Sequence, residues 1–157
     1  LLCKVIAAFK GDDYRSAFVD SMAFGGYNKR FEPARTDKDW LTRDEKEVDA
    51  YLANPWCTFR FTVNAYYHMF CGIEYAQKKE NIEKIPKDLP LYLVAGSDDP
   101  VGNFGKGVEN VAKTYRECGI KDVSLKLYEK DRHEILNELD RQVVYEDILA
   151  WVEAHLL

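Results

Sequence analysis

An apolar run covers residues 91–95 and stops at Gly96, after which the adjacent carboxylates of Asp98 and Asp99 follow. Five apolar residues without polar alternation predict a strand whose two faces are both covered, as in parallel sheets that pack between helices. Open α/β sheets place their functional groups beyond the carboxyl ends of such strands. Asp99 precedes a proline, which keeps its neighbour out of the helical region, so the backbone fixes the direction of this carboxylate.

A second strand is predicted for residues 122–128, where apolar and polar residues alternate as in a strand near a sheet edge. His133 follows that strand closely. The intervening residues 105–118 predict a helix, with apolar residues at helical spacing at Val108, Val111, Ala112 and Tyr115. A strand, a helix and a strand form a right-handed crossover that aligns both carboxyl ends on one rim. Asp99 and His133 are therefore candidates for one site.

Residues 1–84 predict helices and no convincing strand. The first helix, over residues 1–9, is amphipathic, with an apolar face formed by Leu2, Val5, Ile6 and Phe9. Residues 42–45 match a capping box that opens a helix carrying Val48, Tyr51 and Leu52. A longer helix is predicted over residues 59–79. Glycines, a proline and charges make residues 25–40 a loop with one short turn.

A run of lysines and glutamates over residues 78–87 separates the helical part, residues 1–84, from the α/β part, residues 85–157. The closing residues 141–157 predict a helix that covers the sheet, with one side formed by Val144, Ile148, Trp151, Val152 and His155.

Composition excludes several classes of function. The chain has 157 residues and a formal net charge of −5 without a basic cluster, which argues against nucleic acid and anionic membranes as main partners. The four cysteines lack the spacing of a zinc site or a disulfide framework, so the expected location is a reducing, cytoplasmic compartment. No stretch is long enough to span a bilayer, and no metal site is expected.

Two predicted strands leave a parallel sheet with unpaired edges. A strand as apolar as residues 91–95 requires neighbours on both sides. We therefore expect the remaining strands to come from another chain, or this chain to be the carboxyl-terminal part of a larger protein.

Three segments resemble the carboxyl-terminal half of the lysophospholipase and monoacylglycerol lipase group of α/β-hydrolases, also described as serine aminopeptidase-like. They are residues 96–102 (GSDDPVG), 105–108 (GKGV) and 132–138 (RHEILNE). The helical cap of that family is similar to this chain at Phe24, Asn28–Phe31, Asp39–Leu41 and Arg43–Glu45. The resemblance implies an α/β fold in which residues 1–84 form the cap and residues 85–157 the last part of the hydrolase core.

By that resemblance, Asp99 matches the acid and His133 the general base of a nucleophile, acid and base triad, which follow in this chain order in α/β-hydrolases. The acid orients the imidazole, and the imidazole takes a proton from the serine and returns it to the leaving group. Asp98 is the alternative acid. The family often has small residues before the arginine and histidine, where this chain has Lys130 and Asp131, so the shape of the histidine loop is expected to differ.

The nucleophile is the largest departure from the family. The serines are Ser16, Ser21, Ser97 and Ser124, and none has a glycine two residues before and two after it. The elbow that presents the serine, and the amides of the oxyanion hole, are therefore expected upstream of this chain together with the first strands. The resemblance implies that this chain alone is inactive and that its partner is the missing amino-terminal part of the core.

Candidates for substrate contact are Val101, beside the acid, and four aromatic residues of the helical part, namely Trp40, Phe61, Tyr66 and Phe70. Helix packing explains most of the aromatics, but a lid over an acyl-chain tunnel also needs apolar side chains that face the site.

The function implied is hydrolysis of carboxylic esters, such as monoacylglycerols or lysophospholipids, through an acyl-serine intermediate without a metal or organic cofactor. Two alternatives stay open. The chain can be a binding or scaffold module that kept a hydrolase fold without its chemistry, or the same triad can hydrolyse peptide or amide bonds.

Overall fold

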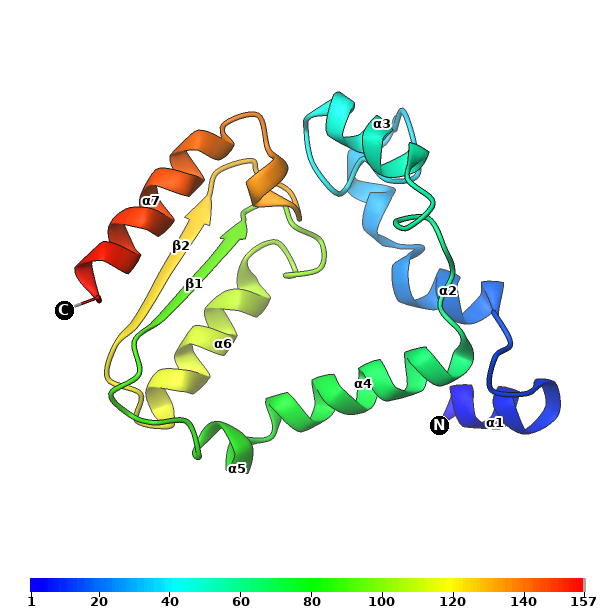
Figure 1. The fold of residues 1–157 in the computed structure, drawn as a ribbon, viewed down its shortest axis with the longest axis horizontal. Helices are drawn as coiled ribbons and strands as arrows, with labels where there is room; N and C mark the ends of the chain where they lie inside the picture. The colour runs from blue at the N-terminus through cyan, green and yellow to red at the C-terminus, as the bar shows by residue number, and fades with distance from the viewer. Residues whose placement is uncertain (157) are drawn as a thin grey trace.

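The computed structural model describes residues 1–156, and its first half is helical (Figure 1). The helices of that half are α1 (Leu2–Lys10), α2 (Ala17–Phe24), the 3-10 turn η1 (Tyr27–Phe31), α3 (Glu45–Ala53), α4 (Val63–Gln77) and the short α5 (Lys79–Ile82). The second half contains β1 (Leu91–Gly96), α6 (Lys106–Glu117), β2 (Val123–Tyr128), the 3-10 turn η2 (Ile135–Asn137) and α7 (Arg141–Ala154).

Among residues 1–156 the sheet consists of β1 and β2, which pair in parallel with Leu91 opposite Val123 and Gly96 opposite Tyr128. Because α6 connects the two strands, their carboxyl ends lie on the same rim, as the sequence predicts. This register sets the start of the loop after Gly96 beside the start of the loop after Tyr128.

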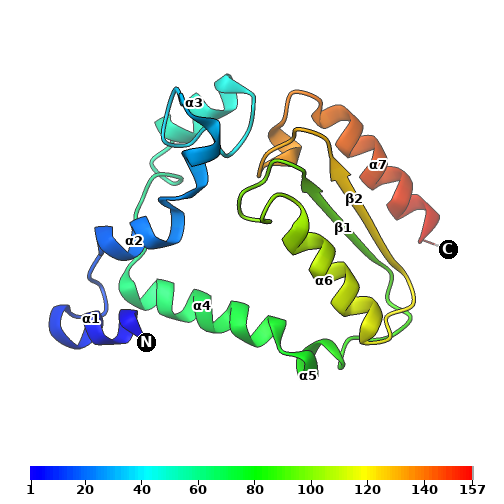
Figure 2. The ribbon, with the colours of Figure 1, turned by 180° about the vertical axis from the view of Figure 1, so that it is seen from behind.

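The sheet is covered on both faces, with α6 on one side and α7 on the other (Figures 1 and 2). On the α6 side, Leu93 and Leu125 pack against a core that includes Ala112. On the α7 side, Val94 packs against a core of Tyr128, Ile135 and Val144. The residues of β1 before Gly96 are nevertheless only half-buried, because this strand has its one described neighbour on the β2 side.

The helical half has its own core. α1 packs along α4, and the buried residues there are Cys3, Val19, Val63 and Tyr66. Of the predicted apolar face of α1, Ile6 packs against this core, but Leu2, Val5 and Phe9 are exposed, and Cys3 is buried instead.

The predicted capping box is also wrong. α3 begins at Glu45, and Asp44 is its cap, since the Asp44 carboxylate accepts a hydrogen bond from the Lys46 amide at 3.1 Å. Thr42 is 1 % exposed and donates its hydroxyl hydrogen to the carbonyl of Asn137 at 2.9 Å. The threonine therefore joins the helical half to the histidine loop.

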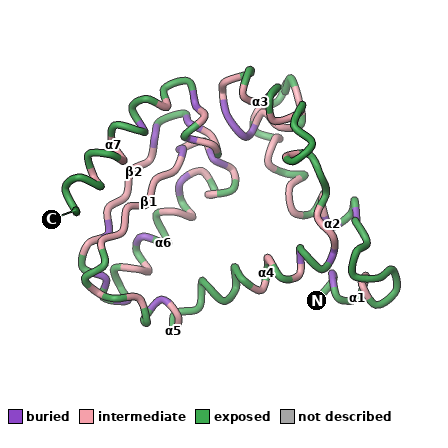
Figure 3. Tube along the Cα trace, viewed as in Figure 1, coloured by how far each residue is buried: buried purple, intermediate pink, exposed green. Residues whose placement is uncertain are grey.

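The helical half extends away from the sheet as an arm, with α4 leading outward and the segment before α3 returning to the rim of the sheet (Figures 1 and 2). Burial follows this arrangement (Figure 3). Most of α4 is exposed, whereas residues 40–42 are buried beside the ends of the strands. No helix among residues 1–156 combines the length and the apolar character needed to cross a bilayer.

Candidate active site

Asp99 and His133 meet at the rim of the sheet. The Nδ1 atom of His133 lies 3.1 Å from Oδ2 and 3.2 Å from Oδ1 of Asp99. Asp99 is 6 % exposed, while the side chain of His133 is 38 % exposed. A buried carboxylate therefore holds one nitrogen of an imidazole whose other edge is accessible.

The loop after β1 aims the Asp99 carboxylate. Its Oδ1 accepts a hydrogen bond from the backbone amide of Val101 at 2.8 Å, and its carbonyl accepts one from the Phe104 amide at 2.8 Å. Asn103 and Phe104 have φ values of 50° and 56°, a left-handed conformation that non-glycine residues adopt at a cost. Within this turn the Phe104 amide comes back to the Asp99 carbonyl, so the loop closes beside the acid.

The strand end needs a glycine to approach the histidine loop. A Cβ atom at Gly96 would overlap the backbone carbonyl groups of Asp131 and Arg132. The amide of Asp98 donates to the carbonyl of Asp131 at 2.9 Å across this contact. The acid loop and the histidine loop are thus packed backbone against backbone.

The electrostatics of the pair favour a protonated imidazole. The hydrogen bond with Asp99 raises the pKa of the His133 imidazole above its ordinary value, and this effect outweighs the partial burial that lowers it. When the imidazole is neutral, an ionised Asp99 accepts the hydrogen on Nδ1 and leaves Nε2 free to take a proton. This is the arrangement that a general base requires.

Both close contacts of His133 Nδ1 with a carboxylate go to Asp99 among residues 1–156. Asp98 joins the histidine loop through its backbone amide instead. The structure therefore pairs His133 with the residue that precedes the proline.

The segment before α3 supports the histidine. The backbone carbonyl of Trp40 accepts from the His133 amide at 3.4 Å, and that of Leu41 accepts from the Glu134 amide at 2.7 Å. The indole ring of Trp40 is 7 % exposed and lies 5.2 Å from the imidazole, measured between ring centroids. The helical half therefore contributes one wall of the site.

Three of the residues predicted to contact substrate line two neighbouring cavities between α2, α3 and the start of α4. Phe61 and Tyr66 border a cavity of about 260 Å³, and Trp40 borders one of about 320 Å³. Both cavities are bordered by Asp20, Phe24, Tyr51, Cys57 and Phe59.

The other two predicted contact residues do not border these cavities. Val101 is 45 % exposed beside Asp99, and Phe70 is 45 % exposed on α4, where its ring stacks on that of Tyr66. Tyr66 itself is fully buried and donates its hydroxyl hydrogen to Asp20 at 2.6 Å. Burial of the hydroxyl group, together with its hydrogen bond to Asp20, raises the pKa of Tyr66 well above its ordinary value.

Sequence reasoning missed a group of buried charges below the histidine loop. Asp131 and Glu138 are fully buried, and the guanidinium of Arg43 forms ion pairs with both and with Asp140. Burial and the neighbouring carboxylates of Asp140 and Glu138 raise the pKa of Asp131 to about 7, although Arg43 opposes the shift. Arg43 stood in the wrongly predicted capping box and in the segment 43–45 that resembles the cap of the family, and neither signal gave it a long-range partner.

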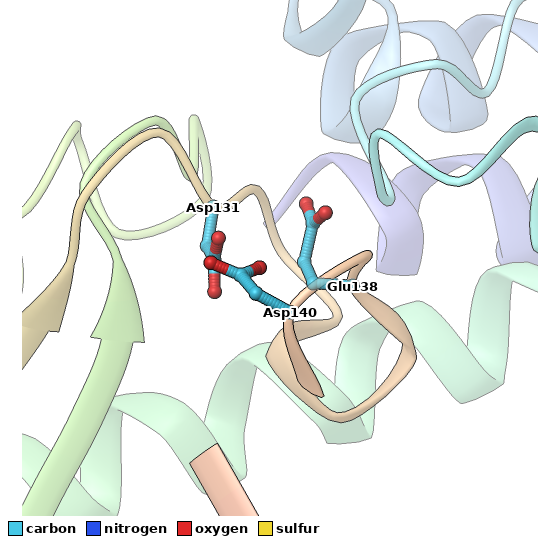
Figure 4. Close-up of side chains that lie close together, drawn as sticks. All are labelled: Asp131, Glu138 and Asp140. Atoms are coloured by element: carbon cyan, nitrogen blue, oxygen red, sulfur yellow. The ribbon is translucent and has the colours of Figure 1, made fainter. Parts of the chain in front are cut away.

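Asp131, Glu138 and Asp140 lie close enough for one cation to contact all three (Figure 4). The Arg43 guanidinium already supplies positive charge to each of these carboxylates. The group is therefore an ion-pair cluster in which Arg43 contacts all three carboxylates.

The serines take structural roles where their contacts are defined. The Ser97 hydroxyl oxygen accepts from the Lys130 amide at 2.8 Å, and that of Ser16 accepts from the Val19 amide at 3.3 Å and caps α2. No serine side chain among residues 1–156 is hydrogen-bonded to His133.

Comparisons with known proteins give results of the same kind. Residues 7–140 match the family model described as serine aminopeptidase, S33. A monoacylglycerol lipase of Mycolicibacterium smegmatis is 28 % identical over 123 residues, which are 76 % of this chain and 40 % of the lipase.

Solved structures agree. A thermostable carboxyl esterase from Bacillus coagulans, in complex with glycerol, superposes with a TM-score of 0.88 and 28 % identity over 98 % of this chain and 50 % of the esterase. A lipase in an open form gives a TM-score of 0.81 and 26 % identity over 94 % of this chain and 48 % of the lipase. The chain thus spans half or less of the length of these relatives.

Proposed function

Because the chain belongs to the serine aminopeptidase S33 family of hydrolases, we propose that Asp99 and His133 are the acid and the general base of a Ser-Asp-His triad. The observation that carries this proposal is the contact of 3.1 Å between His133 Nδ1 and Asp99 Oδ2. The reaction is the hydrolysis of a carboxylic ester through an acyl-serine intermediate.

The two residues of the pair have different tasks. Asp99 keeps the hydrogen of the neutral imidazole on Nδ1 and stabilises the imidazolium that forms when Nε2 takes the serine proton. His133 then returns that proton to the leaving alcohol, and it activates the water that releases the acid.

The nucleophilic serine belongs to residues outside this chain. The serines present lack the glycine spacing of a nucleophile elbow, and the relatives that match are about twice as long as this chain. In this proposal the elbow segment completes the site at the rim of β1 and β2, and residues 1–157 alone do not react.

Monoacylglycerols or lysophospholipids are the proposed substrates. One relative is named a monoacylglycerol lipase, and the solved relatives are named an esterase and a lipase. The cavity bordered by Phe61 and Tyr66 is lined mostly by aromatic side chains, and the one bordered by Trp40 is lined by aromatic and charged side chains. Each is of a size that accepts part of an acyl chain. Phe70, whose ring stacks on that of Tyr66, and Val101, beside Asp99, are further proposed substrate contacts outside the cavities.

The experiment uses the complete product of the reading frame that encodes these residues. We expect that frame to contain Gly-x-Ser-x-Gly upstream, and its product to be labelled covalently by a fluorophosphonate probe. The variant His133→Gln should lose labelling, whereas His68→Gln, an exposed position on α4, should keep it.

Two outcomes contradict the proposal. Labelling that survives His133→Gln would remove His133 from the reaction. A frame that starts at this chain and a product that binds no probe would favour a binding module that kept only the fold.

A further inference from the structure

Arg43 joins the two ends of the loop that carries His133. Its Nε atom donates to Oε2 of Glu138 at 2.9 Å, and its Nη2 atom donates to Oδ1 of Asp131 and, at 2.6 Å, to Oδ1 of Asp140. Asp131 lies two residues before His133 and Glu138 five residues after it. One guanidinium therefore links the residues before and after His133 in this loop.

The carboxylate of Glu138 extends the connection to the backbone next to the histidine. Its Oε1 atom accepts from the amide of Arg132 at 2.9 Å and from the amide of Arg43 at 3.1 Å. Its Oε2 atom also accepts from the Leu139 amide at 3.2 Å. Four donors thus hold a fully buried carboxylate, and one of them is the amide group directly before His133.

The other end of the loop is joined to the acid. Asp131 is fully buried, its carbonyl accepts from the Asp98 amide at 2.9 Å, and its carboxylate reaches Arg43. The Oδ2 atom of Asp131 is buried without a hydrogen-bond partner among residues 1–156. The Arg43 guanidinium is the cation that favours the charged form of this carboxylate, against burial and the carboxylates of Asp140 and Glu138.

We propose that Arg43 is a positioning residue for the imidazole of His133. By binding Asp131 and Glu138 together, it sets the path of residues 131–138 and so holds His133 Nδ1 against the Asp99 carboxylate. This inference rests on the proposed function for its catalytic consequence, but the geometry it predicts is measurable without any reaction. It also assigns a role to Asp131, which replaces the small residue that is frequent in the family.

An arginine suits this role better than a lysine. The planar guanidinium donates from Nε and Nη2 at once and can bind two carboxylates in fixed directions, whereas an ammonium group is a single point charge. Arg43→Lys therefore keeps the positive charge of the cluster but loses the two fixed hydrogen-bond directions of the guanidinium, here called the fork. This variant distinguishes a positioning effect from an effect of charge alone.

The experiment is a titration of the histidine side chains by NMR, which reports the pKa and the tautomer of each imidazole. In Arg43→Lys and Arg43→Gln we expect the His133 pKa to fall, by most of the shift that Asp99→Asn produces. The neutral imidazole should also lose its preference for hydrogen on Nδ1. His155, which contacts Trp151 and Asp122 at the far end of the sheet, should not change.

The sign of the shift distinguishes positioning from electrostatics. Removing the positive charge of Arg43 would by itself make protonation of His133 easier and raise its pKa. Loss of the Asp99 contact lowers the pKa instead. A fall in both variants supports positioning, and an unchanged or raised His133 pKa in folded Arg43→Gln overturns it.

Arg35→Gln is the matched control. Arg35 makes an ion pair of 2.7 Å with Asp49 on α3. This variant therefore also breaks an arginine–carboxylate ion pair, but one that does not involve the histidine loop. It should leave the His133 titration unchanged, and a fall as large as that of Arg43→Lys would overturn the proposal. If Arg43→Gln does not fold, Arg43→Lys decides alone, since a normal His133 titration there means that the fork is not needed.

The two proposals fail in different ways. If Asp99→Asn shifts His133 but the Arg43 variants do not, the dyad stands and the positioning role is wrong. If the Arg43 variants shift His133 but the complete product binds no fluorophosphonate, the positioning geometry stands and the hydrolase function is wrong.

Discussion

Trp40 and His133 are in contact twice, through a backbone hydrogen bond of 3.4 Å and through rings whose centroids lie 5.2 Å apart. These residues are far apart in the chain and belong to its helical and its α/β halves. The histidine is therefore held between the loop after β1, which presents Asp99, and the segment between η1 and α3, which carries Trp40. Substitutions beside Asp99 and substitutions beside Trp40 should therefore both affect the imidazole of His133.

Trp40→Ala should destabilise the fold by about 3–5 kcal/mol, because it removes a buried ring that packs on Tyr27 and His133. Trp40→Phe should cost less, because it keeps part of the aromatic contact. Trp56 is 83 % exposed, so Trp56→Ala is the control and should stay within about 0.5 kcal/mol. Urea unfolding midpoints measure all three, and equal losses for the two alanine variants would contradict this packing role.

Gly96→Ala should destabilise the fold by about 1–3 kcal/mol, because the added methyl group must displace the backbone of Asp131 and Arg132. The displacement also moves the histidine loop away from Asp99, so the His133 pKa should fall. A Cβ at Gly26 meets open space, which makes Gly26→Ala the control. Thermal unfolding with histidine titration tests this, and a stable variant with a normal His133 pKa would show that the close approach is unimportant.

Stability should fall as the pH rises towards 8, because the folded-state pKa values of Asp131, about 7, and of His133 both lie above those of the unfolded chain. A raised pKa gives stabilisation that is complete below the unfolded value and lost as the pH passes the folded value. For Asp131 the window runs from about pH 4 to about pH 7.

Asp131→Asn removes the contribution of that carboxyl group. The fall in the free energy of unfolding between pH 5 and pH 8 should therefore be smaller in this variant by on the order of 1 kcal/mol. Asp37→Asn, at an exposed ion pair with Lys38, should leave the profile unchanged. Urea unfolding at several pH values measures the slope. A profile that is as steep in Asp131→Asn as in the unaltered protein would contradict the raised pKa of Asp131.

Asp99→Asn should lower the His133 pKa and move the acid limb of the pH-rate profile of the complete product to lower pH, because the hydrogen bond that raises this pKa is lost. The rate at the optimum should fall by about 10⁴-fold, since the asparagine favours the wrong tautomer. Asp98→Asn is the matched control. A larger loss for Asp98→Asn than for Asp99→Asn would exchange the two assignments.

Much of the fold was predictable, because hydrophobic periodicity is a local signal. The strands at residues 91–96 and 123–128 and the crossover helix α6 lie where the pattern predicts them. The predicted fold class, part of an α/β-hydrolase with helices before it, is confirmed by the similarity to the carboxyl esterase. The predicted division at residue 84 stays a prediction.

What failed depends on contacts between distant residues. The face of α1 is chosen by α4, so Cys3 is buried and Phe9 is not. Thr42 prefers the Asn137 carbonyl over the helix it was expected to cap. The ion pairs of Arg43 with Asp131 and Glu138 join residues about 90 positions apart in the chain, and no local pattern marks them.

Whether His133 is the general base is decided by the rate at which the complete product hydrolyses a monoacylglycerol, measured for the unaltered protein and for His133→Gln. If His133 is the general base that Asp99 orients, the rate should fall by at least about 10³-fold while the variant keeps its fold. A folded His133→Gln variant that hydrolyses the ester at the unaltered rate would contradict the account.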